Sequence, residues 1–110
     1  MQERKKKRLE SVLRDILTKF LEAELDVPNG IFVSVSRIEI RESGSMAKAV
    51  VSVYPATGVH DIEKKLKKME YRAKTYIGSQ LSLKYIPDIR FEIDIGEKMR
   101  EKIESILENK

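Results

Sequence analysis

Residues 63–81 have the sequence "EKKLKKMEYRAKTYIGSQL", and the pattern in this stretch decides the fold class. Its apolar residues recur at steps of three and four, the period of an amphipathic α-helix. The stripe that would face a core consists of Ile62, Leu66, Met69, Ala73, Tyr76, Ile77 and Leu81. A helix with one apolar face must bury that face against another layer, so the flanking segments determine what that layer is.

The flanking segments predict strands. On the C-terminal side, residues 81–94, "LSLKYIPDIRFEID", predict a strand that bends at Pro87 or lacks a ladder donor there. On the N-terminal side, residues 31–41 and 46–54 predict two strands joined around "ESGS", most simply as a hairpin.

The first of these strands carries two apolar sets of opposite parity. They are Ile31, Val33 and Val35 in one set, and Ile38 and Ile40 in the other. A regular strand cannot bury both sets against one layer, because its side chains alternate between two faces. We therefore predict a β-bulge or a strong twist near Ser36 and Arg37.

Two further helices are predicted near the chain ends. Residues 4–25 carry an apolar stripe of helical period, and Pro28 and Gly30 end that helix. Gly96 precedes a short amphipathic helix over residues 97–110. Its apolar positions are Met99, Ile103, Ile106 and Leu107. One-sided helices and a small sheet indicate an α+β fold, with the helices packed on one face of the sheet.

Composition bounds the class of protein. The chain has 110 residues, which suits one domain, and it has no cysteine, which excludes disulfides and thiolate metal sites. No apolar run approaches the roughly 20 residues that span a membrane, and no signal-peptide pattern follows the N-terminus. We expect a soluble cytoplasmic protein without membrane association.

Charge is distributed unevenly along the chain, although its total is only +4. Residues 1–21 and residues 59–84 each hold seven basic against three acidic side chains, whereas residues 22–58 and 85–110 are net acidic. Such asymmetry indicates a surface for an anionic partner, although a charged surface that merely keeps the protein soluble would show similar numbers.

Catalytic constellations are absent from the sequence. The one histidine, His60, precedes the central helix, where a surface role is the common one. No nucleophile elbow, P-loop or dinucleotide-binding fingerprint occurs. The carboxylates at 101, 104 and 108 alternate with basic residues, which is typical of a solvated helix face. We therefore expect no enzyme, no cofactor and no metal.

The central helix presents its basic residues on two flanks. At about 100° per residue, Lys64, Lys65, Lys68 and Arg72 fall within one arc beside the apolar stripe. Lys67 and Lys74 lie on the other flank, and Tyr71 is adjacent. Phosphate oxygens are what such surfaces bind most generally, and an exposed aromatic ring can stack on unpaired bases.

The strand segment resembles the L-x-L-x-x-[VI]-P-x-[LI]-x-F-x-x-D stretch of bacterial ribosome-binding factor A. Its positions are occupied by Leu81, Leu83, Ile86, Pro87, Ile89, Phe91 and Asp94. "RLESVLRDILTKFLEAEL", "GIFVSVSRIEI" and "MAKAVVSVY" are similar to the family's first helix and hairpin strands, in the same order, and a closing pattern follows Asp94. The resemblance covers essentially the whole chain.

This resemblance implies a type II KH-like domain over residues 1–110, with residues 1–8 as a basic N-terminal extension. It also implies an interhelical kink at Ala73, Lys74 and Thr75, where the family carries Ala-x-Gly and this chain has threonine in place of the glycine. Because threonine does not readily adopt a positive φ, the joint is expected as a right-handed bend or as a nearly continuous helix.

The resemblance further implies a non-catalytic factor, monomeric when free, that binds ribosomal RNA of the immature small subunit. It would support late maturation, including processing of the precursor's 5′ end. The implied RNA-binding residues are Arg4, Lys5, Lys6, Lys7, Arg8, Lys64, Lys65, Lys68, Arg72, Lys74, Lys84 and Arg90. The alternatives are a protein–protein adaptor that docks through its C-terminal amphipathic helix and, more weakly, a nuclease.

Overall fold

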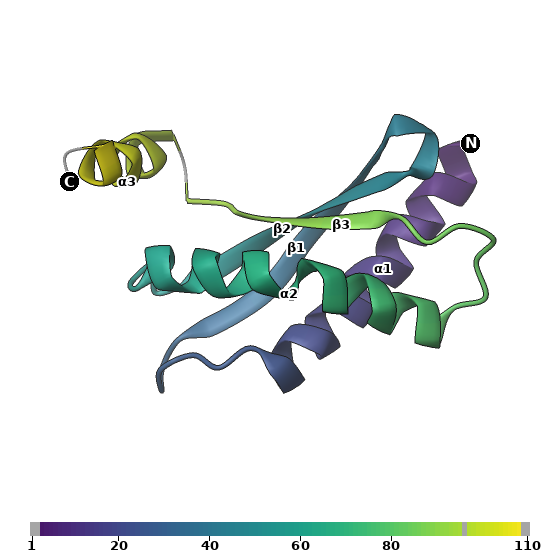
Figure 1. The fold of residues 1–110 in the computed structure, drawn as a ribbon, viewed down its shortest axis with the longest axis horizontal. Helices are drawn as coiled ribbons and strands as arrows, with labels where there is room; N and C mark the ends of the chain where they lie inside the picture. The colour runs from purple at the N-terminus through teal and green to yellow at the C-terminus, as the bar shows by residue number, and fades with distance from the viewer. Residues whose placement is uncertain (1–2, 96, 109–110) are drawn as a thin grey trace.

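The computed structural model describes residues 3–95 and 97–108 (Figure 1). Its elements are α1 (Glu3–Glu24), β1 (Phe32–Arg41), a 3-10 turn η1 (Glu42–Gly44), β2 (Met46–Tyr54), α2 (Val59–Gln80), β3 (Asp88–Ile93) and α3 (Glu97–Glu108). The predicted α+β class, the hairpin and the order of the elements are confirmed.

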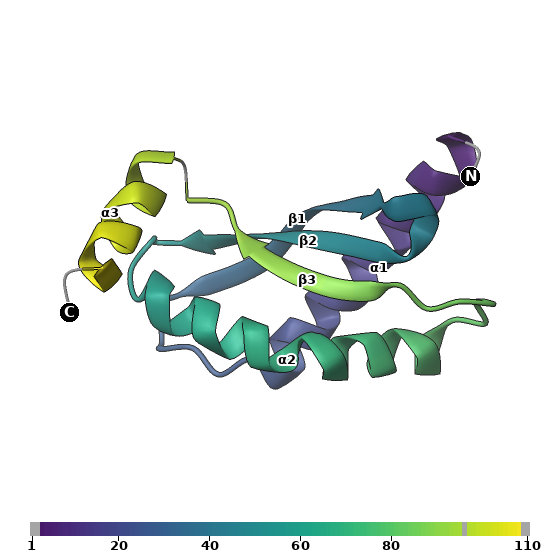
Figure 2. The ribbon, with the colours of Figure 1, turned by 45° about the horizontal axis from the view of Figure 1, so that its top comes forward.

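The sheet is mixed, with the strand order β1-β2-β3. β1 pairs antiparallel with β2 through the hairpin, whereas β3 returns parallel to β2 after the crossover through α2. Figures 1 and 2 show α1 and α2 on the same face of this sheet, with α1 against β1 and α2 along β3. The core lies between the two layers, and the other face of the sheet is open.

The predicted β-bulge is confirmed at Ser36. The β1–β2 register shifts between Val35 and Arg37, and the Ser36 hydroxyl donates a hydrogen bond of 3.0 Å to the Val50 carbonyl. The extra residue returns Ile38 to the face that Val35 occupies, so both apolar sets enter one core. A single serine thus resolves the conflict of parity in the sequence.

The third strand is shorter than the sequence predicts. We expected a strand over residues 81–94, but β3 begins at Asp88, directly after Pro87, and residues 81–87 form the connection from α2. Proline has no N–H to donate to a ladder. The first bond from β3 runs from Asp88 N to the Ser45 carbonyl (2.9 Å).

Side chains from the helices accept hydrogen bonds from both outer edges of the sheet. Edge strands expose backbone N–H groups that need acceptors. Three such groups are satisfied: Val35 N donates to Thr18 Oγ1 (3.4 Å), Ile40 N to Glu10 Oε2 (3.1 Å) and Phe91 N to Glu70 Oε2 (2.8 Å). α1 therefore serves the β1 edge, and α2 serves the β3 edge.

The C-terminal helix α3 lies beyond the end of β3, at the opposite end of the molecule from the N-terminus (Figures 1 and 2). The predicted helix is confirmed over Glu97–Glu108, and Ile106 on it is 57% exposed. Asn109 and Lys110 lie outside the described residues, as do the side chains of Met99, Ile103 and Leu107. The predicted docking face of this helix is thus described only at Ile106.

Candidate nucleic-acid interface

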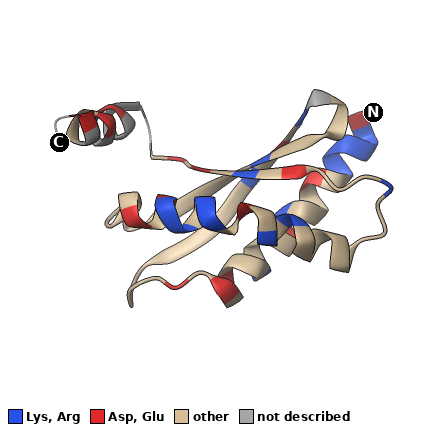
Figure 3. Cartoon of the chain, in the orientation of Figure 1, with Lys and Arg blue, Asp and Glu red and all other residues tan. Residues whose placement is uncertain are grey.

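α2 turns its apolar stripe inward and leaves its basic residues at the surface. Val59, Ile62, Leu66, Met69, Ala73 and Ile77 are buried. Figure 3 shows Lys and Arg recurring along this helix, and the side chains of Lys64, Lys65, Lys67, Lys68 and Arg72 are exposed. The helical period thus fixes both the contacts of α2 with the core and the position of its charges.

Lys64, Lys65, Lys68 and Arg72 form what we call the α2 ridge, and two of the four have partners within the protein. Lys65 Nζ donates to the Asp26 carbonyl (2.7 Å) just after α1, and Arg72 Nη2 lies 3.6 Å from Glu24 Oε2 at the end of α1. Lys64 and Lys68 are exposed and have no hydrogen-bond or ion-pair partner within residues 3–95 and 97–108. These two lysines are the cations of the ridge most available to an anionic partner.

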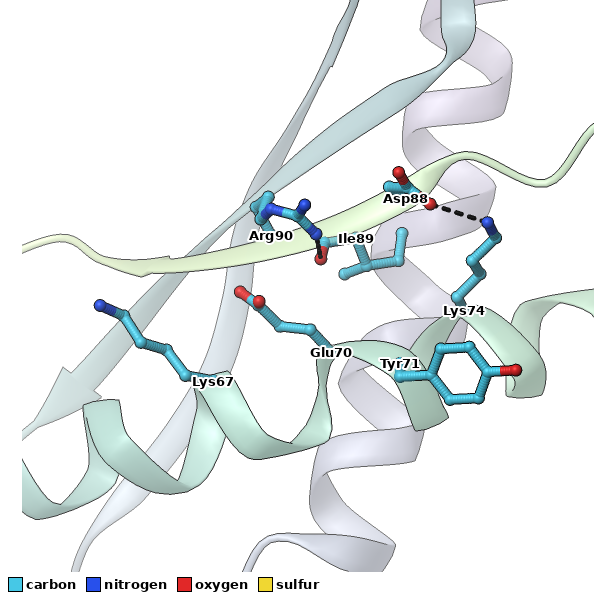
Figure 4. A pocket seen from close by; sticks show the side chains of 7 residues that line it. All are labelled: Lys67, Glu70, Tyr71, Lys74, Asp88, Ile89 and Arg90. Carbon is cyan, nitrogen blue, oxygen red and sulfur yellow. Dashed lines mark hydrogen bonds and ion pairs between the residues drawn. The ribbon is translucent and has the colours of Figure 1, made fainter.

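The other flank of α2 forms a groove with β3, shown in Figure 4. This α2–β3 groove has a volume of about 460 Å³. It is lined by Lys67, Glu70, Tyr71, Lys74, Asp88, Ile89 and Arg90. It brings together Lys74 and Arg90, two of the predicted RNA-binding residues that come from different elements.

The charges in the groove are partly matched. Lys74 Nζ donates to Asp88 Oδ1 (2.7 Å), and this bond, with the charge of the ammonium group, lowers the pKa of the Asp88 carboxyl. The Arg90 guanidinium folds over the strand edge and donates to the Ile89 carbonyl (3.1 Å). The Glu70 carboxylate reaches from α2 to β3, where its Oε2 accepts a hydrogen bond from Phe91 N (2.8 Å).

Sequence reasoning missed the acidic half of this groove. Glu70 and Asp88 were not singled out, and Lys67 was placed on this flank but not among the binding residues. The spacing of Lys67, Tyr71 and Lys74 at i, i+4 and i+7 was the available signal, because such residues share one helix face. The position of β3 beside that face depends on its parallel pairing with β2, which no local sequence pattern indicates.

The expected kink at Ala73, Lys74 and Thr75 is not a break between two helices. α2 runs continuously from Val59 to Gln80, so of the two expected outcomes the structure has the continuous helix. The Thr75 hydroxyl donates to the Tyr71 carbonyl one turn earlier (3.2 Å), a bond that the helical conformation allows. A β-branched residue is more restricted in conformation than a glycine, so this position lacks the freedom that would allow a kink.

The remaining predicted residues lie apart from the α2 ridge. Residues 4–8 are not an extension but the first turns of α1, beside the η1 hairpin turn (Figures 1 and 3). Lys84 lies in the connection before β3 rather than in the strand, and its Nζ sits 5.7 Å from the centre of the Tyr85 ring. The structure therefore distributes the predicted cations along the molecule.

The open face of the sheet holds charges that are matched among themselves. Its open-face network joins the cations Arg37, Arg41 and Lys48 to the anions Glu39, Glu92 and Asp94. Glu39 is the centre, at 2.6 Å from Arg41 and 2.9 Å from Arg37. Hydrogen bonds from these arginines lower its pKa to about 2. Within this network the three cations are balanced by three anions.

The described residues include neither a membrane-spanning helix nor a cluster of metal-binding side chains. None of the helices there is long and apolar enough to cross a membrane, and residues 3–95 and 97–108 hold no group of three histidine, cysteine or acidic side chains placed to bind a metal ion. His60 is half-buried at the start of α2, and its Nδ1 has no hydrogen-bond partner in that part of the chain.

The mixed three-stranded sheet, with α1 and a lysine-rich α2 on one face, defines a KH-like domain. The family model described as ribosome-binding factor A matches residues 5–107. The chain belongs to the ribosome-binding factor A family.

Individual relatives agree with this assignment. Ribosome-binding factor A from Brevibacillus brevis is 32% identical over 96 residues, covering 83% of this chain and 76% of that protein. The solution structure of a Thermotoga maritima protein, described as a candidate ribosome-binding factor A, gives a TM-score of 0.68 at 26% identity and covers 83% of this chain and 88% of that one.

A third relative has been placed in an assembly. It is the Thermus thermophilus ribosome-binding factor A, fitted as a homology model into the cryo-EM map of a 30S–factor complex. Its TM-score is 0.66 at 20% identity, and the match covers 80% of this chain and 93% of that one. At that identity the likeness shows the fold.

Proposed function

We propose that this chain is a non-catalytic assembly factor that binds ribosomal RNA of the immature small subunit. It is cytoplasmic and monomeric when free, and in its bound state it supports late maturation of the subunit, including processing of the precursor's 5′ end. Residues 1–110 form one RNA-binding domain. Family membership over residues 5–107 supports this role, and so does the 30S complex of the Thermus thermophilus relative.

The observation that carries the proposal is the pair Lys64 and Lys68 on the outer side of α2. An exposed ammonium group without an acidic partner can neutralise an RNA phosphate, and the cations condensed around that phosphate are then released. Arg72 extends the contact, because an exposed ion pair such as the one with Glu24 contributes little and exchanges partners readily. Lys65 extends it as well, since its hydrogen bond to the Asp26 carbonyl does not neutralise its charge. Residues 4–8 and Lys84 supply further contacts along a molecule whose longest dimension is 43 Å.

Phosphate contacts position a protein on RNA without reading its sequence. The action we infer is therefore a shift of population: the factor binds one conformation of an unfinished rRNA region better than others and raises its share. It dissociates when the mature fold removes that differential affinity. No bond is made or broken by the protein in this scheme.

The test is co-sedimentation of the full chain with immature and mature small subunits. The variant Lys64→Glu/Lys68→Glu should lose association with the immature subunit while keeping its far-UV circular dichroism. The matched control is Arg14→Glu/Lys19→Glu, which makes the same change of net charge at exposed positions of α1. Unchanged sedimentation of the first variant would contradict the proposal. An equal loss of association in both variants would mean that net charge, and not the position of Lys64 and Lys68, determines binding.

The adaptor alternative rests on α3, which stands away from the two-layer core and exposes Ile106. Removing residues 97–110 separates the two functions. An rRNA-binding factor of the kind proposed keeps its salt-sensitive binding to the immature subunit without α3. A docking adaptor loses its association altogether and shows no steep dependence on salt.

A further inference from the structure

We propose that the α2–β3 groove binds one unpaired nucleotide and prefers guanine, with the base stacked on Tyr71 and its edge held by Lys74 and Asp88. This inference rests on the proposed function, because it names the part of the RNA that one site takes. It differs from the α2 ridge in kind: the ridge contacts phosphates of any sequence, whereas the groove distinguishes bases.

Tyr71 supplies the stacking surface. Its side chain is 79% exposed in the middle of α2, where a large ring gains nothing from the core. Figure 4 shows the ring standing beside Lys74 at the mouth of the groove. Aromatic rings in cationic grooves stack on bases of single strands, and each such contact contributes on the order of tenfold or more in affinity. A base-paired nucleotide cannot offer its face in this way.

The pair of Lys74 and Asp88 supplies the reading groups. Their 2.7 Å bond leaves Asp88 Oδ2 and two ammonium hydrogens free for a ligand, and both side chains remain partly exposed. The lowered pKa of Asp88 keeps the carboxylate ionised, and so acceptor-only, at neutral pH. An acceptor and a donor therefore stand side by side at the wall of the groove.

Guanine is the base that uses both groups most fully. Its Watson–Crick edge presents two adjacent donors, N1–H and the N2 amino group, beside the O6 acceptor. The carboxylate accepts from both donors while the ammonium group donates to O6. Uracil offers the carboxylate one donor, and adenine and cytosine each offer it one amino group. Paired contacts of this kind discriminate between bases by roughly tenfold.

The other charges of the groove place the phosphate. Lys67 and Arg90 lie along the same groove and can donate to a phosphate oxygen. The Arg90 guanidinium donates to the Ile89 carbonyl through Nη1, which leaves its other nitrogens for the phosphate. Glu70 holds a negative charge between them, and its bond to Phe91 N keeps it there. An acidic peptide would meet this carboxylate and that of Asp88, so the mixed charge favours a nucleotide over such a segment.

Binding of five-nucleotide RNAs, measured by fluorescence anisotropy, tests the inference. The oligomers carry G, A, C or U at the centre between uridines, and an RNA duplex is the paired control. The full chain should bind the guanine oligomer about tenfold more tightly than the all-uridine one, and more tightly than the adenine and cytosine oligomers. Equal affinity for the four single strands, or preference for the duplex, would overturn the inference.

Variants assign the preference to the groove. Tyr71→Ala should lose on the order of tenfold for all single strands, and Tyr71→Phe should recover most of it. Asp88→Asn should abolish the preference for guanine. The matched control is Tyr54→Ala, since Tyr54 is 76% exposed and outside the groove. Thermal melts establish that each variant is folded, and a Tyr71→Ala effect no larger than that of Tyr54→Ala contradicts the inference.

The result is separable from the proposed function. If the chain associates with immature subunits but shows no guanine preference, the groove inference fails and the proposed function stands. If it prefers guanine but does not associate with subunits, the groove inference stands and the proposed function fails. Lys64→Glu/Lys68→Glu should reduce subunit association while leaving the ratio between the guanine and uridine oligomers unchanged.

Discussion

The open face of the sheet and the outer side of α2 carry the same kinds of charged residue in opposite arrangements. On the sheet, three cations and three anions are joined in one network around Glu39. On α2, Lys64 and Lys68 have no partner among the described residues. A count of basic residues therefore does not locate a binding surface. What matters is which charges are already neutralised by the fold.

The largest expected effect concerns the unpaired side of this comparison. Replacing Lys64 and Lys68 by glutamine should weaken binding to immature subunits by roughly tenfold or more and lower the slope of log K against log salt by about two. Binding titrations at several salt concentrations measure both quantities. Glutamine at Arg14 and Lys19 is the control, and an unchanged slope in the α2 variant would show that these lysines contact no phosphate.

The next effect concerns Glu70, an α2 residue that serves the sheet. Glu70→Ala removes the acceptor of Phe91 N at the β3 edge, and an unsatisfied backbone group of this kind costs about 1–2 kcal/mol. Urea denaturation should show that loss. Glu22→Ala, an exposed change on α1, should leave the free energy of unfolding within about 0.5 kcal/mol. Equal stability of the two variants would mean that water replaces the acceptor.

The paired side of the comparison predicts a dependence on pH. Because the pKa of Glu39 is lowered from 4.5 to about 2 in the folded protein, the stability it contributes is fully present above pH 4.5 and is lost as the pH falls toward 2. Glu39→Gln removes this dependence, so the gap in stability between the chain and the variant should shrink by about 1 kcal/mol across that range. Subunit binding at pH 7 should not change, and a loss of binding would place the open face in the interface.

The smallest expected effect converts a paired cation into a free one. Glu24→Gln releases Arg72 from its partner at 3.6 Å, so Arg72 would resemble Lys64. Affinity for immature subunits should rise by roughly two- to threefold while stability changes by less than about 0.5 kcal/mol. The double variant Glu24→Gln/Arg72→Gln should show no such gain. A gain that persists there would come from net charge rather than from Arg72.

The sequence was sufficient for features that depend on local periodicity. Opposite parity in one strand predicted the bulge at Ser36, and steps of three and four predicted the buried stripe of α2. The start of β3 was wrong because the apolar residues before Pro87 support the core from the connection: Leu81, Leu83 and Ile86 are half-buried there. An apolar alternation does not distinguish a strand from a loop that packs on the core.

The candidate site was predictable only in its helical part. The α2 ridge follows from the helix wheel, and Lys65 and Arg72 do lie on the flank opposite Lys67 and Lys74. The groove was not predictable, because it requires the parallel return of β3 beside α2. The partners of Lys65 and Arg72, the Asp26 carbonyl and the Glu24 carboxylate, lie just after and at the end of α1, which is distant in sequence and adjacent only after folding.

The helix side chains that bond to the sheet edges have a consequence for how the chain folds. The β1–β2 hairpin is local, but the side-chain acceptors of its outer N–H groups at Val35 and Ile40 come from α1. β3 is the last strand in the sequence, and it depends on α2 in two ways. α2 forms the crossover that returns β3 parallel to β2, and it supplies Glu70 as the acceptor of Phe91 N. Strand pairing and helix docking are thus one cooperative event, and a partly folded chain without its helices would present two open edges for aggregation.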